Sequence, residues 1–356
     1  SMIDVLMPTP APRLCRVLDF ALSGTAHRFV SAQEELRGRR LLFALHTDEG
    51  GMDAETLAFL RRLRREPDAL RGSVGAVLLD GTCDLYTKQL AQDIVLAANL
   101  AGCLFPGKPL VEGTGSLYNQ HILAKQYGMS LMETYQTRAR ELVRRLECFS
   151  APQFRRPRLL LLHASESGRS STLWLGREVC KRLQEVCEIT EISLQNGTIH
   201  DCRGCSYSAC LHFAENGGCF YGGAISETVL PAICDCDAML FLCPNYNDAV
   251  GANISALFNR LTSLLLHTEL YDKYLFGIIV SGYSGGDLVA RQLLGAMCLN
   301  KTVMLPPQFC MLRTANDLPT AQSAPDAADC IEAFAAHLRS TLTGEKAHPG
   351  KNIAEK

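Results

Sequence analysis

The sequence predicts an α/β protein of two domains, the second built on a doubly wound parallel sheet. Short apolar runs without polar alternation, such as Leu159–Leu162, alternate along the chain with segments of helical period. This pattern is typical of parallel strands that helices cover on both faces. The length of 356 residues exceeds one typical core. Residues 150–158 contain two prolines and three arginines, so we place a linker there, between domains 1–150 and 151–342.

The composition is that of a globular cytoplasmic protein. Hydrophobic residues make up 47% of the chain and charged residues 20%. A formal charge of −2 lacks the basic excess of a nucleic-acid binder, so we expect no nucleic-acid partner. No apolar run reaches membrane-spanning length and no secretory leader is seen, so we expect no membrane partner. The 16 cysteines, many within apolar periods, indicate a reducing cytoplasm with mostly free thiols.

The first half alternates between helical and strand patterns. We predict helices over 12–36, 54–65, 87–100, 117–126 and 134–146, and strands over 41–45, 74–79 and 110–111. The turn His46–Gly51 contains Asp48 and Glu49, and two carboxylates repel a phosphate. We therefore expect a degenerate α/β domain without a nucleotide site of its own.

The second half is more regular. We predict strands over 159–162, 188–194, 238–243, 274–280 and 302–305, and helices over 170–187, 226–234, 251–266 and 287–299. Five strands joined by helical crossovers favour the flavodoxin-like strand order, in which ligands bind at the carboxyl edge where the order reverses. Residues 343–356 are polar and Gly/Lys-rich and are expected to form a flexible tail.

The turn after the strand 159–162 has the composition of a phosphate cradle. A helix that starts directly behind a parallel strand points its free N–H groups and its positive dipole end at this edge. Gly168 lets the backbone approach a ligand closely. Hydroxyl donors and one cation complete the turn: Ser165, Ser167, Arg169, Ser170, Ser171 and Thr172. The alternative is a Ser/Thr-capped helix that binds nothing.

Two more strand ends of this half carry turns suited to a flat aromatic ligand. The turn after 238–243 supplies an aromatic ring and backbone N–H groups through Pro244, Asn245, Tyr246 and Asn247. The turn after 274–280 is Gly-rich and contains Gly282, Ser284 and Gly285. Three such turns on one edge of one sheet predict a bound mononucleotide.

These turns carry a family resemblance. Residues 159–315 resemble the NADPH-dependent FMN reductase-like flavoproteins, in particular the iron–sulfur flavoprotein branch. The matching parts are Ser165–Thr172, Pro244–Tyr246 with Leu257–Arg260, and a cysteine-rich insertion. The resemblance implies a flavodoxin-like fold, with the FMN phosphate in the first turn and the isoalloxazine between the other two. It also implies NAD(P)H as co-substrate and a homo-oligomer.

The insertion, residues 201–223, contains Cys202, Cys205, Cys210 and Cys219. A C-x-x-C opening lets two neighbouring thiolates reach one metal centre, and Fe–S clusters take four thiolates. Four residues separate Cys205 from Cys210, which departs from the compact run of the iron–sulfur flavoproteins. We expect a [4Fe–4S] cluster on these four cysteines, with structural zinc, free thiols or an adventitious disulfide as the alternatives.

The resulting function prediction is an FMN-dependent oxidoreductase. Reduced nicotinamide nucleotide would reduce FMN, which would pass electrons to an Fe–S cluster or to a quinone-like acceptor. No side chain need act as acid or base, so we predict no catalytic residue. One alternative is a non-catalytic flavin/Fe–S electron carrier or redox sensor that acts with a protein partner. Another is a zinc-stabilised binding module that has lost its flavin.

Overall fold

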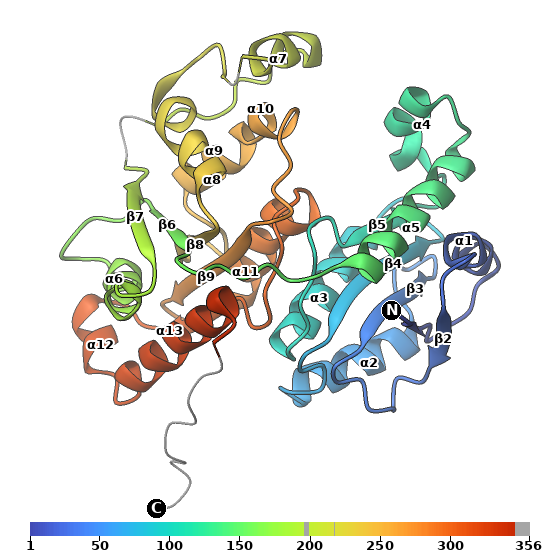
Figure 1. The fold of residues 1–356 in the computed structure, drawn as a ribbon, viewed down its shortest axis with the longest axis horizontal. Coiled ribbons are helices and arrows are strands. Elements are labelled where there is room, and N and C mark those ends of the chain that lie inside the picture. Colours follow the sequence, from blue (N-terminus) through green and yellow to red (C-terminus); the bar gives the residue numbers. More distant parts are fainter. Residues whose placement is uncertain (196–198, 217, 346–356) are drawn as a thin grey trace, which may run out of the picture. The chain divides into compact units, whose positions relative to one another are not determined.

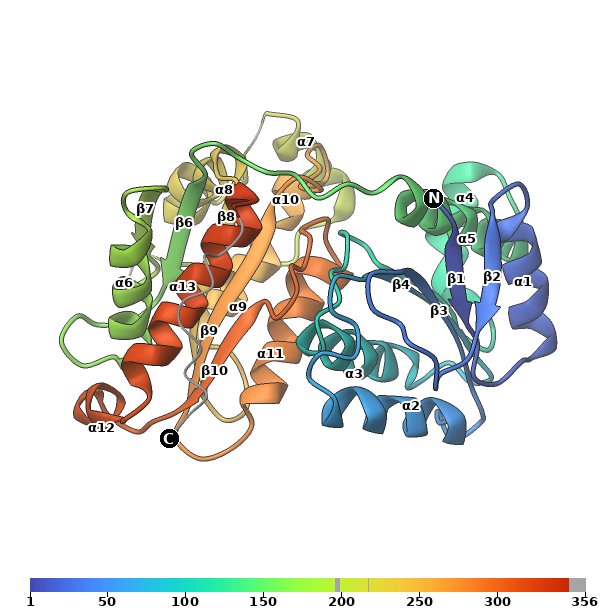
Figure 2. The same cartoon turned by 60° about the horizontal axis from the view of Figure 1, so that its bottom comes forward.

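The computed structural model describes residues 1–195, 199–216 and 218–345. The chain divides into two compact units, each with its own sheet (Figures 1 and 2). Unit 1 comprises Ser1–Ser150 and Leu294–Phe309, and unit 2 comprises Ala151–Leu293 and Cys310–Lys356. Residue 217 of the insertion and residues 346–356 of the expected tail lie outside the described residues. Within the described residues, no helix is both long and apolar enough to cross a membrane.

Unit 1 is built on a parallel sheet of order β2-β1-β3-β4-β5. Its strands are β1 (Ile3–Leu6), β2 (His27–Val30), β3 (Arg40–Thr47), β4 (Val74–Gly81) and β5 (Leu110–Gly113). Its helices are α1 (Pro12–Leu22), α2 (Ala54–Arg65), α3 (Thr87–Leu100), α4 (His121–Tyr127) and α5 (Leu131–Cys148), with a 3-10 turn at Tyr118–Gln120 and a π-helical turn at Gly295–Leu299.

Packing in unit 1 follows the apolar faces that the sequence predicts. Helices α1 and α5 pack side by side on the sheet, where Leu14, Leu18 and Tyr135 join a core with Leu42 and Leu78. Helices α2 and α3 pack against each other. Side-chain caps define where the helices begin, because they satisfy N–H groups that have no partner within the helix. Asp53 caps α2, and Ser130 and Glu133 form a capping box at α5.

The N-terminal part of unit 1 differs from its prediction. The helix expected over 12–36 ends at Leu22, and residues 27–30 form β2, while β1 was not predicted at all. Gly24 at a φ of +81° turns the chain after the helix. The strand β2 has no apolar run of its own, because His27 and Arg28 are polar and only Phe29 and Val30 are apolar. At four residues, β1 is too short for its period to stand out.

Unit 2 is built on a parallel sheet of order β10-β9-β8-β6-β7. Its strands are β6 (Arg158–His163), β7 (Glu188–Ser193), β8 (Ala238–Pro244), β9 (Tyr274–Ser281) and β10 (Cys310–Thr314). Read from the β7 edge, the order along the chain is 2-1-3-4-5, and unit 1 has the same order. The predicted flavodoxin-like parallel sheet is therefore confirmed, and the first sheet is of a similar kind.

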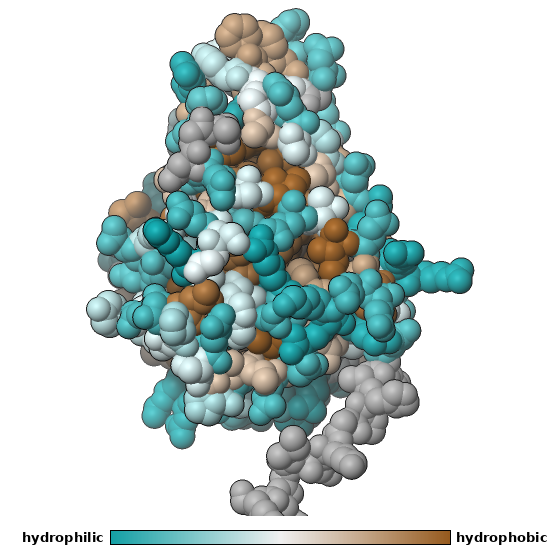
Figure 3. All heavy atoms as spheres, turned by 90° about the vertical axis from the view of Figure 1, so that its left-hand side faces the viewer, coloured by the Kyte–Doolittle hydropathy of each residue, from teal (hydrophilic) through white to brown (hydrophobic). Residues whose placement is uncertain are grey.

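Helices cover both faces of the second sheet (Figure 1). The helices of unit 2 are α6 (Ser171–Leu183), α7 (Tyr207–Ala214), α8 (Leu230–Asp235), α9 (Ala252–Arg260), α10 (Thr262–Leu265), α11 (Gly286–Leu294), α12 (Leu318–Ser323) and α13 (Ala327–Thr343), with a π-helical turn at Ile225–Val229. Helices α6 and α13 pack together. Figure 3 looks onto the side on which α6 and β7 lie in Figure 1, and shows mainly hydrophilic residues with small apolar patches between them.

The fifth strand of unit 2 was predicted at the wrong place. The sheet uses Cys310–Thr314, which pairs with β9, and not residues 302–305. Leu305 instead forms an isolated bridge to Phe105, and the carbonyl of Pro306 accepts a hydrogen bond from buried Asn99, so Leu294–Phe309 belongs to unit 1. A short apolar run next to prolines does not reveal which sheet it joins.

Candidate functional site

Three turns at the carboxyl edge of the second sheet line one cavity of about 520 Å³. From the sequence-predicted set, its lining contains Ser165, Arg169, Ser170, Ser171, Thr172, Pro244, Asn245, Tyr246 and Gly282. Four other predicted residues are not part of the lining: Ser167, Asn247, Ser284 and Gly285. The topology thus brings together residues that are more than a hundred positions apart.

The first turn ends in the N-terminus of α6, where one hydroxyl is left without a partner. Ser170 caps the helix, because its Oγ accepts from the Leu173 N–H at 3.2 Å and lies 3.0 Å from Thr172 Oγ1. Ser171 is 7% exposed, and its Oγ has no hydrogen-bond partner among the described residues. A buried hydroxyl that faces a cavity, together with the free N–H groups of a helix N-terminus, provides hydrogen-bond donors for an anionic group such as a phosphate.

The charges of this turn are exposed. Arg169 lines the cavity and lies 4.0 Å from Glu166 through Nη1 and Oε2, with both side chains largely in solvent. Such a surface pair is weak and its partners separate readily. Arg169 is therefore available to a bound anion. Glu166, which the sequence analysis did not consider, contributes a carboxylate to the same rim.

Asn245 joins the second turn to the third. Its Nδ2 donates to the Ser284 carbonyl at 3.0 Å and lies 3.2 Å from Ser281 Oγ. Its Oδ1 accepts from the Asp248 N–H at 2.7 Å. Gly285 has a φ of +87°, which residues with a side chain rarely adopt, and a Cβ there would lie 2.1 Å from Asp248 Oδ1 and displace that carboxylate. Ser284 and Gly285 therefore shape the cavity without lining it.

A fourth segment completes the cavity and was not predicted. Ala315 and Asn316 follow β10 and belong to the lining. They were missed because the fifth strand was placed at 302–305.

Cys243, at the end of β8, is fully buried, and burial raises the pKa of its thiol to about 12. It stays a neutral thiol at physiological pH and is not a nucleophile.

The four insertion cysteines line a second cavity in unit 2, of about 240 Å³. Burial, and then the neighbouring Cys202, Cys219 and Cys205, raise the pKa of Cys210. Aromatic side chains, including Phe213 and Phe220, share the lining. The described residues contain no group of three or more His, Cys, Asp or Glu side chains that could hold a metal ion.

A buried arginine also faces this second cavity. Arg260 is 4% exposed and donates to the Gly222 carbonyl at 2.7 Å and to Ser226 Oγ at 2.8 Å. Its Nε has no partner among the described residues. A buried cation needs compensating charge or hydrogen bonds, so the cavity is suited to an anionic centre.

In unit 1, the strand that corresponds to β6 is β1, since both sheets have the same order. The turn after β1 contains Pro8, Pro10 and Pro12, which have no N–H to offer a phosphate. The segment His46–Gly51, on which the expectation of no nucleotide site rested, lies at the end of β3, the counterpart of β8, and not at the end of β1.

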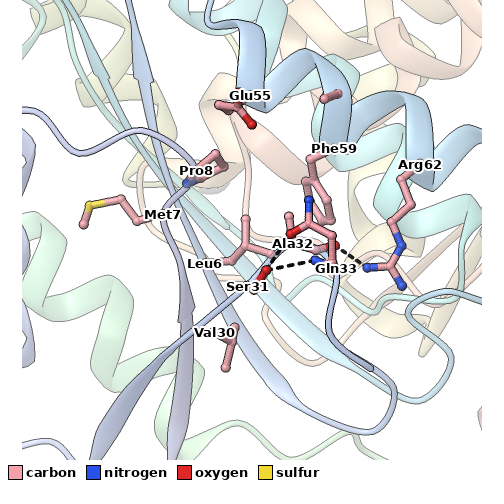
Figure 4. Close-up of a pocket in the computed structure, with 11 residues that line it drawn as sticks. Leu6, Met7, Pro8, Val30, Ser31, Ala32, Gln33, Glu55, Phe59 and Arg62 are labelled. Atoms are coloured by element: carbon pink, nitrogen blue, oxygen red, sulfur yellow. Dashed lines mark hydrogen bonds between the residues drawn. The ribbon is translucent and has the colours of Figure 1, made fainter.

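Arg13 occupies the carboxyl edge of the first sheet. Its guanidinium donates to Asp80 Oδ1 at 2.8 Å and to the carbonyls of Gly81, Thr114 and Gly115. A cavity of about 210 Å³ lies between the ends of β1 and β2 and helix α2, and Figure 4 shows the residues that line it. Arg62 lines it, but its guanidinium donates to the carbonyls of Ala32 and Glu34. Both arginines bind the protein's own backbone.

The second sheet and its turns lie in a part of the chain that is similar to a known protein family. Residues 157–317 match the family model described as NADPH-dependent FMN reductase. No curated protein matches the chain.

Solved structures with similarity include RosB with bound 8-demethyl-8-formylriboflavin-5'-phosphate, at 15% identity over 56% of this chain and 91% of that chain, TM-score 0.42. A putative quinone reductase from Klebsiella pneumoniae is 15% identical over 52% of this chain and 84% of that one, TM-score 0.36. An NAD(P)H:quinone oxidoreductase from Methanothermobacter marburgensis is 15% identical over 55% and 100%, TM-score 0.37.

Proposed function

Residues 157–317 form a domain of the NADPH-dependent FMN reductase family, and from this premise we propose that the chain binds FMN in the cavity of about 520 Å³ and reduces it with NAD(P)H. The domain is a flavin-dependent oxidoreductase of the NAD(P)H-dependent type. Bound FMN would supply the redox chemistry, which is hydride uptake from the nicotinamide nucleotide and electron transfer to an acceptor. The protein supplies binding and orientation.

The residues that would hold FMN follow from the lining. The phosphate would be bound by the N-terminus of α6 together with Ser170, Ser171 and Thr172. Arg169 would be the cation at the rim of the cavity, and Ser165 would lie at the base of the turn. The ring system would be flanked by Pro244, Asn245, Tyr246 and Gly282. The conformation of these turns would be maintained by Asn247, Ser284 and Gly285. The buried Ser171 hydroxyl without a partner supports this assignment most strongly.

Titration of the apoprotein with FMN tests the proposal, with flavin fluorescence as the signal. Ser171→Ala should weaken FMN binding by about tenfold, which is the usual worth of one hydrogen bond to a charged group. Ser193→Ala, on an exposed position of β7, is the control. Steady-state NADPH and NADH oxidation with FMN and a quinone then tests turnover. Absence of FMN binding would refute the proposal.

We further propose that Cys202, Cys205, Cys210 and Cys219 hold a [4Fe–4S] cluster. Zinc binds four thiolates at about 2.3 Å, which brings the sulfurs together around a point. Here the four cysteines share the lining of one cavity of about 240 Å³ with Arg260, a buried cation, and this supports the proposal of an anionic cluster. Iron and sulfide analysis of anaerobically purified protein tests this. Zinc without iron would favour the zinc alternative, and neither metal would favour free thiols.

The electron acceptor decides between an enzyme and a carrier. NAD(P)H oxidation with a quinone-like acceptor would support the reductase. A protein that binds flavin and a cluster but turns over with no donor would support the electron carrier or redox sensor. We also propose a cytoplasmic homo-oligomer, since no disulfide joins the cysteines of the described residues and the family resemblance implies subunit contacts. Sedimentation of the flavin-loaded protein tests the oligomeric state.

A further inference from the structure

We infer that His163, Glu191 and Arg177 act together as positioning residues for the phosphate turn, and that they require His163 in its neutral form. The inference rests on the proposed FMN site and assigns to it three residues that do not line the cavity. It explains how FMN would be distinguished from riboflavin, which lacks the phosphate.

His163 is the last residue of β6 and is 2% exposed. Its Nδ1 accepts the backbone N–H of Ser165 at 3.1 Å, and its Nε2 lies 2.9 Å from Glu191 Oε1. Because Nδ1 accepts a hydrogen bond, it carries no proton, and the proton of the neutral ring is on Nε2, where it is donated to Glu191. The ring thus connects the start of the phosphate turn to β7.

Arg177 connects the other part of the turn to the same carboxylate. Its Nη2 lies 2.7 Å from Glu191 Oε1 and its Nε 3.2 Å from Oε2, and its Nη1 donates to Ser167 Oγ at 3.1 Å. Ser165 and Ser167 are therefore held by one continuous network that runs through β7 and α6. This is why Ser167, a predicted phosphate ligand, does not line the cavity.

The groups around His163 differ in charge: Glu191 is ionised and Cys180 is neutral. The hydrogen bond from Arg177, followed by the one from His163, holds the pKa of Glu191 below its usual range, so Glu191 is a carboxylate at neutral pH. Cys180 on α6 is neutral there, because burial raises the pKa of its thiol to about 12. A proton added to His163 at Nδ1 would face the Ser165 N–H and break that hydrogen bond. The turn would lose its anchor without any change in the residues that contact phosphate.

Parallel titrations with FMN and riboflavin test the inference. The wild type should prefer FMN. His163→Leu and Arg177→Gln should each lower FMN affinity about tenfold and leave riboflavin affinity unchanged. Glu191→Gln should resemble them, whereas Thr190→Ala, on the opposite face of β7, should match the wild type.

Equal losses for FMN and riboflavin would reduce the network to a structural role, and unchanged FMN affinity would overturn the inference. Wild-type protein that binds neither flavin would overturn the proposed function, and the inference with it. The tautomer gives a readout that needs no flavin. Nitrogen-15 NMR of His163 at neutral pH should show a proton on Nε2, and a proton on Nδ1 would refute the network even if the variants failed to fold.

Discussion

Asn245 donates a hydrogen bond to the backbone oxygen of Ser284 at 3.0 Å, and so joins the turn after β8 to the turn after β9. The same side chain accepts from the Asp248 N–H, which shapes its own turn. In a site made of separate turns, the geometry depends on such links, because each turn by itself has several low-energy conformations. The shape of the cavity of about 520 Å³ therefore depends on residues beside it as well as on those that line it.

Asn245→Ala should weaken the binding of FMN and of riboflavin alike, by about tenfold, because the two turns that it joins would flank the ring common to both ligands. Fluorescence titration with each flavin measures this. Asn245→Asp keeps the acceptor for the Asp248 N–H but loses the donor to Ser284, so this variant should bind both flavins nearly as weakly as the alanine variant. A loss confined to FMN would contradict the assignment of these turns to the ring.

Gly285→Ala should destabilise unit 2 more than Gly168→Ala. Both glycines have a φ near +86°, at +87° and +85°, so the backbone strain, about 1–2 kcal/mol, is shared. A Cβ at Gly285 would also meet Asp248 Oδ1 at 2.1 Å, whereas at Gly168 it would meet nothing within 4 Å. Thermal unfolding monitored by Trp174, the single tryptophan, reports on unit 2. Equal midpoints for the two variants would contradict this prediction.

Arg260→Gln should lower the midpoint potential of a cluster on the four cysteines. Reduction adds negative charge, and loss of a buried cation nearby makes the reduced form less stable; each tenfold change corresponds to about 59 mV for one electron. Redox titration of anaerobic protein measures this, with Arg260→Lys as the charge-conserving control. Cys205→Ser should lower the iron content instead. If the midpoint potential of Arg260→Gln equals that of the wild type, the role of Arg260 is structural only.

Arg13→Met should destabilise unit 1 by about 3 kcal/mol at neutral pH, because it leaves the Asp80 carboxylate buried without its cation. Burial, the largest cause, raises the pKa of Asp80 even with Arg13 present. An acid with a raised pKa in the folded state stabilises the fold at low pH, and this contribution is lost as pH rises through the folded pKa. The cost of Arg13→Met should therefore shrink towards acidic pH.

Hydrogen exchange of the β4 and β5 peptides, corrected for the intrinsic rate at each pH, measures this effect. Arg16→Met, an exposed position on the same helix, is the control. Combining Arg13→Met with Asp80→Asn should recover part of the loss, since the unpaired charge is gone. A cost that is independent of pH would show that Arg13 acts through its backbone hydrogen bonds alone.

Cys202 and Cys205 should be alkylated at pH 8 in metal-free protein while Cys243 is spared. The first two thiols are exposed, and Cys243 is fully buried with its pKa raised to about 12. Peptide mass spectrometry after brief iodoacetamide treatment measures the difference. Modification of Cys243 before unfolding would mean that β8 opens in the native state.

Local signals account for what could be predicted. Helices α2 and α3 have the predicted bounds because their apolar period is regular, and Asp53 marks where α2 begins. The Ser165–Thr172 turn was readable because it follows a buried apolar strand and precedes a helical period, so its place at a ligand edge followed from the parallel topology. The strand β2 and the residue Asn316 carried no comparable signal.

The sequence by itself determined the α/β class, the second sheet up to its fourth strand, and the three turns with ligand-binding chemistry, since apolar period and turn composition act over a few residues. Only the tertiary structure decided that Leu294–Phe309 joins unit 1, that Arg13 occupies the edge of the first sheet, and that Ser167 binds Arg177. The reason is that a strand's partner, like a polar group's, is chosen by what the fold brings next to it, at separations along the chain that no local pattern encodes.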